Sequence, residues 1–129
     1  MGYTDDSGLP EITERQFQEN LGKSRPYSVV ILKTGPRFKM PGPEGDPEIT
    51  AIIKEHGKRN MALRDAGIMP IVCPIGDGSG VTGVAVFDAS PEEVQRIYSQ
   101  DPGVKAGVFI FEVHPCRSFP GSCLPMPGD

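Results

Sequence analysis

Two kinds of periodicity alternate along this chain, one typical of strands and the other of helices. The run YSVVILKT, from Tyr27 to Thr34, is rich in β-branched residues and apolar on both faces, which predicts a strand covered on both sides. Between Glu48 and Ala66 apolar residues recur at helical spacing, and Gly67 follows as a good helix terminator. The folded region therefore begins with a strand and a long helix.

One residue interrupts the apolar stripe of that helix. At about 100° per residue, the inward side holds Ile49, Ile52, Ile53, His56, Asn60, Leu63 and Gly67. His56 therefore lies where a core leucine is expected. An imidazole there is either a core residue bonded to a carbonyl or, because it titrates near neutral pH, a group that binds or reacts. Asn60, one turn further on, either bonds to the backbone or orients a substrate oxygen.

The next segments predict a pair of strands. Ile68 to Ile75 is expected to be a strand that lies at a sheet edge or contains a bulge, because Pro70 and Pro74 each remove a hydrogen-bond donor. The glycine-rich run from Gly76 to Gly80 leads into a strand at Val81 to Asp88. A phosphate-binding loop of this kind needs a helix after it, so the run indicates a hairpin turn instead.

The second helix has the clearest start signal. Ser90 is an N-cap serine followed by proline, and Glu93 is placed to close a capping box. Pro102 is expected to stop this helix and to hold Asp101 in an extended conformation just beyond its end. A final strand is expected from Val104 to Val113.

The order of elements predicts an α+β fold. It is the ferredoxin-like βαββαβ arrangement, with two helices on one face of a four-stranded antiparallel sheet. We expect this domain at residues 27–115, an N-terminal extension at 1–26 with a short helix from Ile12 to Leu21, and a Pro-rich C-terminal tail at 116–129.

The predicted sheet has apolar residues on both faces. In the last strand Phe109 and Phe111 point one way, while Val108 and Ile110 point the other. Two helices can cover only one of these faces. The second face is therefore expected to be buried against another copy of the chain, which predicts a homodimer.

Composition narrows the class of protein. The chain has 129 residues, a net charge of −4, no long run of Lys or Arg and no apolar run of the ~20 residues that cross a bilayer. Neither a nucleic-acid partner nor a membrane is expected, and the N-terminus lacks the features of a secretory signal. The three cysteines do not form a disulfide framework, which agrees with a cytoplasmic protein.

Two further groups of residues are candidates for chemistry. His114, Cys116 and Cys123 offer soft metal ligands, but zinc sites usually show paired close spacings that are absent here, so we expect neither a metal nor another cofactor. The loop from Gly35 to Pro47 carries Arg37 and Lys39, which either reach an anionic substrate or keep the loop soluble.

The segment from Tyr27 to Pro115 resembles the YCII-related (YciI-like) family of small dimeric α/β-barrel proteins. The resemblance rests on VVILKTGP, on a helix carrying EH, and on VTGVAVFDASPEEVQRIYSQDPGVKAGVFIFEVHP. It implies that His56 and Asp101 form a His–Asp pair in a pocket. The extension, the Gly/Pro-rich loop and the tail depart from the family pattern.

A His–Asp pair suits proton transfer. A carboxylate bonded to one ring nitrogen fixes the tautomer and leaves the other nitrogen free as a general acid or base. Without a dedicated nucleophile, such a pair favours a lyase or isomerase acting on a small carbonyl or hydroxylated aromatic metabolite, as in relatives associated with removal of chloride from hydroxylated aromatics. Arg37, Asn60 and His114 are candidate substrate-binding residues. The alternative is a non-enzymatic ligand-binding or regulatory module on the same dimeric fold.

Overall fold

The computed structural model describes residues 2–128 and divides them into two compact units. The larger unit, Pro26–Arg117, contains the sheet and three of the helices. The smaller unit consists of the described residues before Pro26 and after Arg117. None of the helices described is long and apolar enough to cross a membrane.

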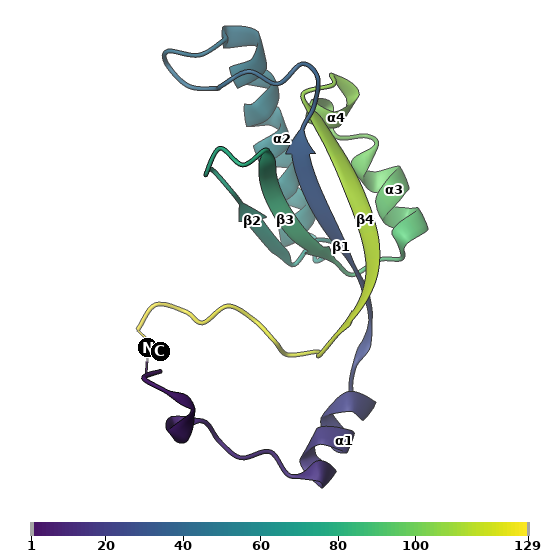
Figure 1. Ribbon diagram of the computed structural model, residues 1–129. Helices are drawn as coiled ribbons and strands as arrows, with labels where there is room; N and C mark the ends of the chain where they lie inside the picture. The colour runs from purple at the N-terminus through teal and green to yellow at the C-terminus, as the bar shows by residue number, and fades with distance from the viewer. Residues whose placement is uncertain (1, 129) are drawn as a thin grey trace. The chain divides into compact units, whose positions relative to one another are not determined.

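The larger unit follows the predicted strand–helix order with one added helix. Its elements are β1 (Arg25–Thr34), α2 (Pro47–Asp65), β2 (Ile71–Pro74), β3 (Val81–Phe87), α3 (Pro91–Tyr98), α4 (Pro102–Lys105) and β4 (Phe109–Ser118). The strands form one four-stranded antiparallel sheet in the order β2-β3-β1-β4. Figure 1 shows α2 and α3 on one face of this sheet. The α+β class and the sheet are confirmed, and they are compatible with a ferredoxin-like fold.

Alternation along the central strands separates the two faces of the sheet. In β1 the buried residues are Ser28, Val30 and Leu32, and the residues between them are half-buried. β3 matches this register, since Val30 pairs with Ala85 and both side chains are buried. These residues pack under the helices with Phe87, Val94 and Tyr98, so the core lies between the sheet and its helical layer.

The long helix α2 has clear signals at both ends. The Asp46 side chain accepts the Ile49 N–H as N-cap, and Pro47 stands in the first turn. At the other end Gly67 has φ +78°, and Gly67 N–H and Ile68 N–H donate to the carbonyls of Arg64 and Leu63. This pattern is a Schellman motif, which requires the left-handed conformation that glycine adopts most readily.

The chain after α3 differs from the sequence prediction. Pro102 was expected to end a helix and Val104 to begin a strand, but Asp101 instead caps the short helix α4, with Pro102 in its first turn. α3 has already ended at Tyr98. An N-cap aspartate followed by proline is itself a helix-start signal. The prediction was wrong because proline can begin a helix as well as end one. Here Pro102 follows an N-cap aspartate, so it begins α4.

The last strand is consequently displaced along the chain. It begins at Phe109 and runs to Ser118, five residues past the predicted end at Val113. Pro115 lies within it, which is tolerated because β4 is an edge strand. β2 is the opposite edge strand, which is one of the two arrangements that its prolines predicted.

The smaller unit contains helix α1 (Glu14–Gly22) and a short 3₁₀ turn, Asp6–Gly8. Thr13 and Gln16 form a capping box at the start of α1. The predicted N-terminal helix is therefore confirmed. Its apolar residues Phe17 and Leu21 are exposed, as is Ile12 just before it, and the helix buries no residue.

Candidate functional site

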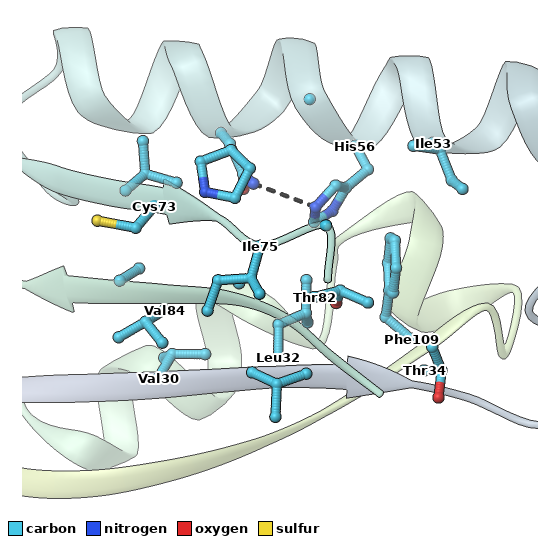
Figure 2. A pocket seen from close by; sticks show the side chains of 18 of the residues that line it. Val30, Leu32, Thr34, Ile53, His56, Cys73, Ile75, Thr82, Val84 and Phe109 are labelled. Atoms are coloured by element: carbon cyan, nitrogen blue, oxygen red, sulfur yellow. Dashed lines mark hydrogen bonds between the residues drawn. The ribbon is translucent and has the colours of Figure 1, made fainter. Parts of the chain in front are cut away.

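A cavity of about 630 Å³ lies within the larger unit, between α2 and the sheet. Figure 2 shows His56 and Ile53 projecting from α2 toward the strands, with Leu32 and Phe109 among the facing side chains. The loop after β1 adds Phe38 and Met40 to the wall. Its volume falls in the range of small-molecule sites.

The cavity wall is mostly apolar. Val30, Leu32, Val72 and Ala85 come from the sheet and hydrophobic side chains predominate throughout. Among the residues that the structure describes, no Asp, Glu, Lys or Arg lines the cavity. The polar side chains of α2 on this wall are His56 and Asn60. Thr34, Thr82 and Tyr98 also line the cavity, so His56 and Asn60 form one polar corner among a few polar side chains in a mostly apolar wall.

His56 is held at that corner by Asp101. Its Nδ1 lies 2.9 Å from Asp101 Oδ1 and 2.8 Å from Oδ2. Both side chains are buried, with the histidine residue 7% and the aspartate 0% exposed. A carboxylate only accepts hydrogen bonds, so Nδ1 is the protonated ring nitrogen. His56 thus has the geometry that the family resemblance implied.

Backbone donors hold the Asp101 carboxylate in place. Its Oδ2 accepts the N–H of Gly103 at 2.9 Å and of Val104 at 3.1 Å, which are the free donors in the first turn of α4. The close approach leaves no room for a side chain at Gly103, where a Cβ would lie 2.6 Å from the Phe109 ring. The cap of α4 therefore also orients the histidine.

The second ring nitrogen of His56 bonds to Asn60. The Asn60 Nδ2 lies 3.1 Å from His56 Nε2. On its other side Asn60 Oδ1 accepts the Tyr98 hydroxyl at 3.2 Å. Asn60 was expected to bond to the backbone or to orient a substrate oxygen. Its amide instead bonds two side chains, and no signal in the sequence pointed to Tyr98 as its partner.

Tyr98 fixes the direction of this chain of hydrogen bonds. Burial, together with the negative charge of Asp101, raises the pKa of Tyr98 to about 12. The intact Tyr98 hydroxyl donates to Asn60 Oδ1. This orients the Nδ2 of the amide toward His56, so Nε2 accepts. The neutral His56 ring carries its proton on Nδ1 and a lone pair on Nε2.

Aromatic rings enclose the histidine. The His56 ring centroid lies 4.6 Å from that of Phe109 and 6.2 Å from that of Tyr98. Gly57 lines the cavity next to His56, and a Cβ built there meets no atom within 4 Å. Glycine inside a helix costs about 1 kcal/mol relative to alanine. Its presence here keeps the cavity wall open beside the imidazole.

Two other predicted site residues lie away from the cavity wall. Arg37 donates to the carbonyl of Ala106 at 2.8 Å and to Glu48 at 3.2 Å, so it ties the loop after β1 to neighbouring elements. Lys39 pairs with Asp46 at 3.4 Å. Neither basic residue lines the cavity. The loop contributes to the wall through Phe38 and Met40, which were not predicted because the charges of the loop were its visible chemical signal in the sequence.

His114 also lies outside the cavity wall. It is exposed on β4 and its Nε2 is 3.3 Å from Glu112 Oε1. The Lys33 ammonium, 3.0 Å from the same carboxylate, and the His114 ring lower the pKa of Glu112. Within residues 2–128 no group of three or more His, Cys, Asp or Glu side chains gathers as a metal site.

We compared the chain with protein-family models and with curated proteins. The chain matches no family model and no curated protein.

Proposed function

We propose that this protein is a small acid–base enzyme of the YciI-like kind, in which His56 transfers a proton to or from a small molecule in the cavity. The observation that carries the proposal is the His56 ring itself. Its Nδ1 is bound to a buried carboxylate, its Nε2 is bonded to Asn60, and both residues line a mostly apolar cavity. A buried pair placed at a cavity in this way is typical of catalytic sites.

The role of each residue follows from its contacts. His56 Nε2 takes the proton as general base and returns it as general acid. Asp101 holds the ring in one tautomer and stabilises the imidazolium that forms, while its own charge is balanced by the two N–H donors of α4. The apolar wall excludes water from the reacting atoms.

The contacts favour proton transfer over acyl transfer. The hydrogen bonds of His56 go to Asp101 and Asn60, and neither side chain is a nucleophile that the ring activates. A lyase or isomerase acting on a small carbonyl or hydroxylated aromatic compound agrees with this arrangement and with the volume and apolar wall of the cavity.

We further propose that two copies pair through the uncovered face of the sheet, as in a dimeric α/β barrel. This face carries Val29, Ile31, Val86 and Ile110, opposite to the helices. Val29 and Val86 are paired across β1 and β3, and Ile110 is 50% exposed. A contiguous apolar sheet face of this kind supports burial against a second copy.

A second function has one observation in its favour. Asn60 already donates a hydrogen bond to His56 Nε2, so Tyr98, Asn60, His56 and Asp101 form a satisfied buried network. Such a network also suits a protein that binds a small ligand without transforming it, because fully bonded polar groups stabilise a buried structure. A ligand-binding module is therefore the alternative function.

Turnover in a mixed metabolite extract distinguishes the two functions. The extract is incubated with the wild type, with His56→Gln and with His114→Gln, the matched change at the only other histidine. If the protein is an enzyme of the proposed kind, the wild type and His114→Gln both deplete at least one compound. The rate of depletion by His56→Gln is then lower by about 10²–10⁴-fold. Depletion by His56→Gln at the wild-type rate contradicts the proposal. A compound retained by the protein but left unchanged supports the binding module.

A further inference from the structure

The cavity lies where a packed core between α2 and the sheet would otherwise be expected. One helical stripe of α2 forms its first wall, made of Ile53, His56, Gly57, Asn60 and Met61. The opposite wall includes Gly83 and Ala85 of β3. Gly57, Gly83 and Ala85 carry at most a methyl group, so about 630 Å³ stays open between the two layers.

The polar side chains of α2 in this wall already have partners. Asn60 and His56 bond to each other, and Tyr98 and Asp101 bond to the same two side chains. A ligand that replaced one of these bonds would gain little, because it would lose the bond that it replaced. Most of the binding free energy must then come from contact between apolar surfaces.

Ions of either sign are disfavoured in the cavity. No Asp, Glu, Lys or Arg lines it among the residues described, and the Asp101 carboxylate is buried outside its wall. The two basic residues of the adjacent loop, Arg37 and Lys39, already pair with Glu48 and Asp46. An ion would therefore lose its hydration without gaining an opposite charge.

Two exposed methionines line the same cavity. Met40, in the loop after β1, is 72% exposed, and Met61, on α2, is 62% exposed. In the larger unit the only other exposed large hydrophobic residue is Ile110, on the uncovered face of the sheet. Exposed apolar side chains gathered at one place mark a binding site, and methionine adapts to ligands of different shapes. The two residues therefore indicate an apolar entrance.

We propose that the cavity takes an uncharged, largely apolar molecule, which enters past Met40 and Met61 and packs against the small residues of α2 and β3. The inference rests on the proposed function and names the substrate class for the same site. The apolar body of the molecule supplies the affinity. Molecules of the same shape that carry a charge are rejected.

Three naphthalene probes with one apolar body test the ligand class. At neutral pH 2-naphthol is uncharged, 2-naphthoate is an anion and 2-naphthylmethylamine is a cation. Titration calorimetry is expected to rank 2-naphthol at least about tenfold tighter than either ion, because each ion loses hydration at the apolar wall. Equal or tighter binding of either ion, or no binding of 2-naphthol, overturns the proposal.

Two surface variants place the binding at the entrance. Met40→Gln and Met61→Gln each replace an apolar contact by a polar side chain of similar length, so each is expected to bind 2-naphthol about three- to tenfold more weakly. Met126→Gln, at an exposed methionine of the smaller unit, should bind as the wild type does. Wild-type affinity in either cavity variant overturns the role of that methionine.

These binding measurements are independent of turnover. The ranking can hold while the wild type leaves every metabolite unchanged, in which case the site for uncharged molecules stands and the proposed catalysis fails. If turnover depends on His56 but the compound depleted is an ion, the enzyme stands and the proposed substrate class fails.

Discussion

The imidazole of His56 meets the carboxylate of Asp101 at 2.8 Å, although the two residues are 45 positions apart in the chain. The contact joins the middle of α2 to the residue before α4. Asp101 thus serves two elements at once, because it caps one helix and orients a side chain on another. The properties of the site depend on this shared carboxylate.

Substitution of Asp101 should separate its two roles. Asp101→Ala removes the cap of α4 and leaves a buried ring N–H unpaired, so we expect a loss of about 2–4 kcal/mol in the free energy of unfolding. Asp101→Asn keeps a good capping side chain and should lose less. Urea denaturation measures the free energy of unfolding of both variants.

The control for Asp101→Asn is Asp46→Asn. Asp46 caps α2 in the same way, through Ile49 N–H, but is bonded to no histidine. We expect Asp46→Asn to lower the free energy of unfolding by less than about 0.5 kcal/mol, since asparagine is as good an N-cap as aspartate. An equal cost at both positions would show that the contact with His56 does not contribute to stability.

Gly57 is predicted to be a position where stability and ligand binding are opposed. Gly57→Ala should raise the free energy of unfolding by about 0.5–1 kcal/mol, because alanine is the better helix former and its Cβ meets no neighbour. Because Gly57 lines the cavity next to His56, the same methyl group should weaken binding of a small aromatic compound such as 2-naphthol. A variant that is more stable and binds as the wild type does would show that this wall does not meet the ligand.

Tyr98 should make stability fall in strong base. Burial raises the pKa of Tyr98 in the folded protein to about 12, above its ordinary value of 10.0. Between these values the native state binds more protons than the unfolded state, so its stabilisation is complete below about pH 10 and is lost as the pH rises toward 12.

Ultraviolet titration and denaturation measure this effect together. The wild type should show one tyrosine that ionises late, and this component should be absent from Tyr98→Phe. The free energy of unfolding should decline more steeply between pH 10 and 12 in the wild type than in the variant. Identical slopes would contradict the burial of an intact phenol at this position.

The uncovered sheet face gives a prediction about assembly. Ile31 lies on this face, between the buried residues Val30 and Leu32. Sedimentation velocity should find a dimer for the wild type and a monomer for Ile31→Lys, because a charge in an apolar interface is costly. Gln95→Lys, on the exposed surface of α3, should remain dimeric. A monomeric wild type would remove the proposed dimer.

Local patterns predicted the helix of His56 well. Helical spacing placed His56 and Asn60 on the inward side of α2, and both are buried there. Capping signals predicted the start of α3 and the end of α2 at Gly67. These features depend on neighbours in the chain, so a single sequence is enough to reveal them.

Features that join distant segments were harder to predict. The contact of Asn60 with Tyr98 and the apolar wall from Phe38 depend on how α2, α3 and the loop pack together. Arg37 looked free to bind an anion, but its partners Ala106 and Glu48 come from other elements. Asp101 was paired with His56 through family resemblance, because the spacing of the residues alone gives no such contact.

The position of the proton on the His56 ring shows whether His56 and Asp101 form an acid–base site. Nitrogen-15 NMR resolves the protonated and unprotonated ring nitrogens, and exposed His114 is an internal reference in the same sample. At neutral pH we predict a proton on His56 Nδ1 and a lone pair on Nε2. The chemical shift of Nε2 should change when a small aromatic compound that fits the cavity, such as 2-naphthol, is added. Two results would contradict an acid–base site built on His56 and Asp101. One is a ring protonated on Nε2 alone, and the other is an Nε2 chemical shift that stays the same when the compound is added.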